Sequence, residues 1–78
     1  MYTARFRNST GSGCDMFTSF DAAKRFTIRR IKHDENNATH EQTAETLCHL
    51  AESVNLEAAP FSAGCLGYHY NVLEVAGD

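Results

Sequence analysis

Apolar and polar residues alternate near both ends of the chain, a pattern typical of β-strands. Residues 2–7, YTARFR, place apolar and polar side chains on opposite sides of an extended backbone, which predicts a half-buried strand. Residues 8–13, NSTGSG, have the composition of a hairpin turn, and residues 14–18 can return as a short second strand. Residues 68–75, YHYNVLEV, give the strongest alternation and predict the last strand.

Helical spacing replaces this alternation in the middle of the chain. Residues 20–32 carry apolar side chains on one face, which predicts a first amphipathic helix. Ser19 is the expected N-cap, and Asp21 suits the positive end of the helix dipole. Residues 33–38, HDENNA, interrupt the pattern and predict a loop.

A second helix is predicted to follow this loop. Thr39 and Gln42 have the spacing of a capping box, and the helix is expected to end near Val54. Its apolar face would consist of Ala44, Leu47, Cys48, Ala51 and Val54. Residues 55–67 contain the single proline and two glycines, so irregular structure is expected there, with Phe61 as a buried anchor.

These elements predict an α+β fold in β-β-α-α-β order. Two or three antiparallel strands form a small sheet, and two helices pack on one of its faces. The whole chain, residues 1–78, is expected to form a single compact domain. The first and last strands are expected to be neighbours, and pairing of the last strand across a two-fold axis would permit a homodimer.

Charge divides the chain into a basic and an acidic part, although its net charge is only -3. The first helix carries an exposed basic face made of Arg25, Arg29 and Lys32. No lysine or arginine follows Lys32, whereas eight carboxylates do. The acidic face expected to bind a partner comprises Asp34 and Glu35 of the loop and Glu41, Glu45 and Glu52 of the second helix. A surface of one sign steers a protein toward a partner of the opposite sign.

Neither catalytic nor metal-binding motifs are evident, so we expect a non-enzymatic protein without metal or cofactor. Cys65 and His69 have a conceivable ligand spacing, but structural zinc sites use two paired sets of ligands. Cys48 is expected on the buried face of the second helix, where a thiol is unreactive. No apolar run is long enough to cross a membrane and no signal peptide is evident, so a cytoplasmic location is expected.

Two functions are compatible with this charge distribution. In the first, the acidic face binds a protein partner, namely a basic surface of a host complex that handles nucleic acid. In the second, the basic helix, together with Arg5 and Arg7 of the first strand, grips nucleic acid, and Tyr68 and Tyr70 stack on bases. A third interpretation is that the two helices neutralise one another and that the charges serve only solubility.

The chain resembles the small anti-CRISPR proteins of phages in its overall format. The features that carry this resemblance are the opening YTARFRNSTGSGCDMFT, the helix start SFDAAKRF and the acidic segment THEQTAETLCHLAESVNLE. The resemblance implies a phage protein that binds a type I CRISPR effector complex in the host cytoplasm and blocks DNA binding or nuclease recruitment. The basic segment KRFTIRR departs from anti-CRISPR proteins that simply mimic DNA.

Overall fold

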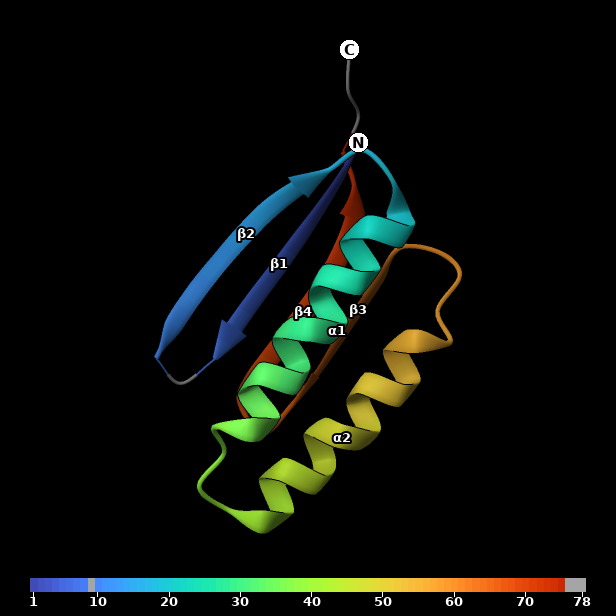
Figure 1. Ribbon diagram of the computed structural model, residues 1–78. Helices are drawn as coiled ribbons and strands as arrows, with labels where there is room; N and C mark the ends of the chain where they lie inside the picture. The colour runs from blue at the N-terminus through green and yellow to red at the C-terminus, as the bar shows by residue number, and fades with distance from the viewer. Residues whose placement is uncertain (9, 76–78) are drawn as a thin grey trace.

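A computed structural model describes residues 1–8 and 10–75, in which four strands form one antiparallel sheet with two helices against one face (Figure 1). In chain order the elements are β1 (Tyr2–Asn8), β2 (Gly11–Phe17), α1 (Phe20–Asn36), α2 (Glu41–Asn55), β3 (Phe61–Cys65) and β4 (Tyr68–Glu74). Ser9, in the predicted turn, and Asp78, among the predicted carboxylates, lie outside the described residues.

The strands are ordered β2-β1-β4-β3, and all three neighbouring pairs are antiparallel. The first and last strands are therefore neighbours, as the sequence predicted. Arg5 of β1 lies opposite Cys14 of β2 on one side and Asn71 of β4 on the other. This register fixes which side chains share each face of the sheet.

The prediction of two or three strands in β-β-α-α-β order is wrong, because the order is β-β-α-α-β-β. The segment expected to be irregular contains β3, which pairs with β4 through a two-residue turn at Leu66 and Gly67. These residues have φ values of 50° and 85°. Positive φ at both positions is what a type I′ hairpin turn requires, and such turns normally show Asn-Gly rather than Leu-Gly. The hairpin could therefore not be recognised from its turn residues.

The position of β4 also corrects the predicted route to a homodimer. Both edges of β4 are hydrogen-bonded, one to β1 and the other to β3, so this strand cannot pair across a two-fold axis. The edge strands of the sheet are β2 and β3.

Helix α1 begins as predicted but ends later. Ser19 is its N-cap, with Oγ accepting a 3.1 Å hydrogen bond from the backbone N–H three residues on. The expected loop at residues 33–38 is wrong, because the helix continues for about one more turn. Two contacts hold this turn: Asp34 is buried against the sheet, and Asn37 Nδ2 donates a 2.8 Å hydrogen bond to the His33 carbonyl.

Helix α2 ends close to the predicted position but begins without a capping box. Its N-cap is His40 rather than Thr39, and the His40 side chain makes no capping hydrogen bond. The His40 carbonyl accepts the Ala44 N–H at 3.0 Å, which sets the first turn. Thr39 therefore lies one residue too early to cap the helix.

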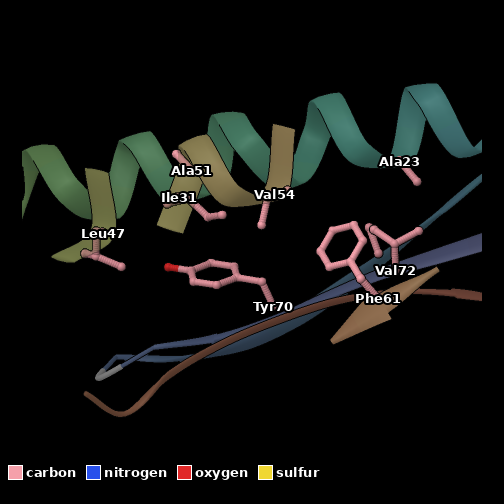
Figure 2. Packing of buried hydrophobic residues seen from close by; sticks show 9 residues of the cluster. Ala23, Ile31, Leu47, Ala51, Val54, Phe61, Tyr70 and Val72 are labelled. Atoms are coloured by element: carbon pink, nitrogen blue, oxygen red, sulfur yellow. The ribbon is translucent and has the colours of Figure 1, made fainter. Parts of the chain in front are cut away.

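The hydrophobic core lies between the helices and one face of the sheet (Figure 2). Helix α1 packs on β1 and β4, while α2 contacts α1 and β3. The buried apolar residues are Ala4, Ala23, Ile31, Leu47, Ala51, Val54, Phe61, Tyr70 and Val72. Phe61 is thus the buried anchor expected from the sequence. No helix in the described part of the chain covers the other face of the sheet (Figure 1).

Candidate functional site

Three carboxylates form a continuous stripe on the outer side of α2. Glu41, Glu45 and Glu52 are separated by four and seven residues, which places them on one face of a helix. All three side chains are exposed, while Leu47 and Val54 fix the opposite face in the core. Of the five residues predicted for the acidic face, these three form the exposed stripe on α2, and the name acidic face refers to them from here on.

His49 is the side chain that makes close contact with the acidic face. Its Nε2 lies 3.9 Å from Glu45 Oε1, and its Nδ1 lies 3.7 Å from Glu52 Oε2. All three side chains are about 70% exposed, and the histidine carries charge only when it is protonated. Exposed pairs of this kind contribute only about 0–1 kcal/mol. They leave the carboxylates accessible to a partner.

Helix α1 carries the opposite charge on a separate stripe. Arg25, Arg29 and Lys32 are all exposed and follow one face of the helix. None of the ion pairs formed within residues 1–8 and 10–75 joins α1 to α2. The two helices lie side by side (Figure 1), yet their charges are not matched in pairs.

A groove between α1 and α2 is lined by residues of both charged stripes. Lys32, Glu35 and Glu52 contribute to its walls, together with Cys48. Lys32 is not within the 4.0 Å ion-pair distance of either glutamate. Glu35 is partly buried in this groove, so it is less accessible than the acidic face.

Lys24 connects α1 to the end of α2 through hydrogen bonds. Its Nζ donates to the carbonyls of Asn55 and Glu57, at 3.1 and 3.0 Å. The last carbonyls of a helix lack partners within the helix, and a lysine ammonium satisfies them well. Lys24 therefore caps α2 instead of neutralising its glutamates.

Asp34 has a different place from the one predicted for it. It was expected in an exposed partner-binding loop, but it is 5% exposed and lies inside α1. Oδ2 accepts a 2.5 Å hydrogen bond from the Tyr70 hydroxyl, and Oδ1 accepts one of 3.2 Å from Asn8 Nδ2. Asp34 thus ties α1 to the sheet and is not available to a partner.

The surroundings of this carboxyl group are polar and partly enclosed. Arg30 Nε lies 3.9 Å from Asp34 Oδ1, and the Arg30 guanidinium stacks 4.1 Å from the centre of the Phe6 ring. Burial, followed by the hydrogen bond to Asp34, raises the pKa of Tyr70 well above its usual value. The hydroxyl therefore stays protonated and acts as a donor, which supports a structural role for the cluster.

The two tyrosines proposed to stack on bases point into the protein. Tyr70 is buried, and Tyr68 packs beside the core on the same face of the sheet. Neither ring is free on the open face, so the predicted stacking platform is wrong. Of the features predicted for nucleic-acid binding, the basic stripe of α1 is exposed, whereas the two tyrosine rings are not.

The cysteines are all free and occupy different environments. Cys48 is exposed, which corrects its predicted place on the buried face of α2, and Cys14 is exposed on β2. Burial raises the pKa of the Cys65 thiol. Cys65 packs toward the core, whereas its predicted ligand partner His69 is exposed on the opposite face. No cluster of three or more His, Cys, Asp or Glu side chains in the described residues could hold a metal ion.

Sequence reasoning missed a second polar surface on the open face of the sheet. Arg5 and Arg7 project there from β1, beside His69 and Asn71 of β4. The alternation of residues 2–7 contained the signal, because it separated both arginines from the apolar side of the strand. The sequence-based hypothesis grouped both arginines with the basic helix as one nucleic-acid surface, whereas they lie on the face of the sheet that no described helix covers.

Comparison with known proteins adds no relative: no family model, curated protein or solved structure matches the chain. Among the described residues, no helix is long and apolar enough to cross a membrane. Inferences about function therefore rest on the geometry of the acidic face and of the other surfaces.

Proposed function

We propose that the chain is a non-enzymatic inhibitor that binds a protein partner through the acidic face of α2. The observation that carries this proposal is the exposure of Glu41, Glu45 and Glu52 without an ion pair to the basic residues of α1. Unpaired surface carboxylates raise the rate of encounter with a basic surface by about 10 to 1,000-fold at low salt. The complementary partner is a protein surface rich in lysine and arginine.

Complexes that bind DNA expose such basic surfaces. An acidic helix docked on one of them would exclude the phosphate backbone of DNA by competing for the same cations. This mechanism agrees with the anti-CRISPR resemblance of the sequence. The proposed target is a type I CRISPR effector complex in the cytoplasm of a phage-infected host, where DNA binding or nuclease recruitment would be blocked.

A DNA-binding assay tests this function. Purified type I effector complexes are incubated with increasing amounts of the chain and then with labelled target DNA. We expect at least one complex to lose DNA binding, or to keep it and lose recruitment of its nuclease, at near-stoichiometric amounts of the chain. If every complex binds DNA and recruits nuclease normally at large excess, the proposed function is wrong.

Nucleic-acid binding by α1 is the second candidate, and one observation favours it. Arg25, Arg29 and Lys32 form an exposed stripe with no carboxylate partner across the helix pair. The stripe is short, and Arg5 and Arg7 lie on the opposite side of the molecule, so the cations do not form one groove. A gel-shift titration at low salt should show a shift at micromolar protein if this candidate holds, and none if it does not.

A further inference from the structure

The open face of the sheet has two distinct halves. Near the chain termini it carries large exposed apolar side chains: Met1, Met16, Leu73 and Val75. Near the β1–β2 turn it forms a polar hollow of about 670 Å³. The hollow is lined by Arg5, Phe6, Arg7, Ser12, Gly13, Cys14, Ser62, His69 and Asn71.

Strand register shows that the apolar side chains form one patch. Thr3 of β1 lies between Met16 of β2 and Leu73 of β4. The Val75 N–H donates a 2.9 Å hydrogen bond to the Met1 carbonyl, which continues the pairing by one residue. Thr3 is only 6% exposed although no described helix covers it, because it lies between Met16 and Leu73 and its hydroxyl contacts the Met16 sulfur at 3.2 Å. Contiguous exposed apolar surface of this kind marks an interaction site.

The polar half of the open face is cationic and lacks internal partners. None of the described residues that line the hollow is acidic. Neither Arg5 nor Arg7 has a carboxylate within 4.0 Å in the described part of the chain. Asn71, which lines the hollow, has a side-chain oxygen that is buried and has no hydrogen-bond partner among the described residues.

We propose that this open face binds a protein segment that presents apolar side chains next to carboxylates. The apolar residues would cover Met16 and Leu73, and the carboxylates would pair with Arg5 and Arg7. Bidentate pairing of arginine with carboxylate is strong and directional. This surface lies on the opposite layer from α2, so the inference is independent of the proposed function.

The same observations disfavour nucleic acid as the occupant. Among the described residues, the open face offers no Phe, Tyr or Trp ring for base stacking, since Phe6, Tyr68 and Tyr70 pack on the helix side. A phosphate backbone would also leave the apolar patch exposed. The net charge of -3 further opposes a polyanion.

Selection from a random peptide library tests the proposal. The library is selected in solution against the whole chain, and the enriched peptides are synthesised and titrated by fluorescence anisotropy. We expect them to combine Asp or Glu with large apolar residues. Replacing Arg5 and Arg7 together by glutamate, or Leu73→Asp alone, should weaken their binding by about tenfold or more, because each change removes a central contact.

Matched variants make the result specific. The triple variant E41K/E45K/E52K should bind the peptides as the wild type does, because it alters only the helix layer. Circular dichroism checks that each variant is folded, and Leu73→Ser replaces Leu73→Asp if the latter unfolds. If the variant with glutamate at positions 5 and 7 unfolds, the variant R5A/R7A replaces it.

Four results would overturn the proposal. The first is a selection that enriches no peptide. The second is a set of peptides that bind the Arg5, Arg7 and Leu73 variants as tightly as they bind the wild type. The third is an oligo-thymidine that binds more tightly than the peptides and loses affinity with Arg5 and Arg7. The fourth is a concentration-dependent dimer, seen by sedimentation, that Leu73→Asp abolishes, because a second copy would then be the occupant.

Discussion

The Tyr70 hydroxyl donates a 2.5 Å hydrogen bond to Oδ2 of Asp34 and thereby joins the last turn of α1 to the centre of the sheet. Replacing Tyr70 by phenylalanine leaves one oxygen of a buried carboxyl group without its donor. We expect the free energy of unfolding to fall by about 1–3 kcal/mol, measured by urea denaturation.

Tyr68→Phe is the matched control for this change. Tyr68 lies on the same strand and the same side of the sheet but is only partly buried. Its substitution should change the free energy of unfolding by less than about 0.5 kcal/mol. If both substitutions changed the free energy of unfolding equally, the hydrogen bond from Tyr70 to Asp34 would make no measurable contribution to stability.

The same tyrosine predicts a loss of stability in alkali. Because the pKa of Tyr70 is raised in the folded chain, the hydroxyl keeps its proton at a pH where the unfolded chain releases it. Its contribution is complete below pH about 10, the usual tyrosine pKa, and declines above that by about 1.4 kcal/mol per pH unit. Urea denaturation from neutral pH to pH about 11 should show the wild type approaching Tyr70→Phe in stability. A difference that stays constant across that range would contradict this assignment.

Phe6 packs so closely on β2 that residue 13 has room only for glycine. A Cβ atom on Gly13 would lie 2.7 Å from Phe6 Cζ, and the Arg30 guanidinium already lies 4.1 Å from the centre of the same ring. Gly13→Ala should therefore displace the ring and lower the free energy of unfolding by about 1–3 kcal/mol. Ser12→Ala, on the exposed neighbouring position, is the control and should change little. Wild-type stability in Gly13→Ala would show that the ring moves freely.

Lys24 predicts a local effect at the end of α2. Lys24→Met keeps most of the side-chain length but removes the hydrogen bonds to the carbonyls of Asn55 and Glu57. We expect a loss of about 0.5–1.5 kcal/mol and faster amide exchange in the last turn of α2. Lys32→Met is the control, because Lys32 is exposed and makes no ion pair in the described structure. Exchange rates that are alike in both variants would contradict the capping role.

The sequence predicted the elements whose periodicity is long and regular. The Ser19 cap and the buried Phe61 follow from local pattern, and the pairing of the first and last strands follows from the need to cover a free strand edge. Strand β3 was missed because it has only five residues, contains Gly64 and gains its stability from pairing with β4. Short segments of this kind are defined by their neighbours rather than by their own propensity.

The exposure of a candidate site residue could be predicted where it follows from helical spacing. It could not be predicted where a tertiary contact determines whether the side chain is buried. The acidic face of α2 was correctly placed on the surface because its positions oppose Leu47 and Val54. Asp34 was misplaced because its burial depends on Tyr70, which is 36 residues away in the sequence. The local sequence of residues 33–36, HDEN, does not show whether the Asp34 carboxylate is buried or exposed to solvent.

Charge reversal of α2 tests the central claim, that its carboxylates are a free docking surface. The measurement is the dissociation constant for the type I effector complex that the chain inhibits. E41K/E45K/E52K should weaken binding by about 100-fold or more, because like charges would then face each other across the interface. The charge reversal R25E/R29E on α1 should leave the affinity within about threefold, because neither residue lines the groove beside Glu52. Unchanged affinity in the α2 variant, with both variants folded, would contradict the account.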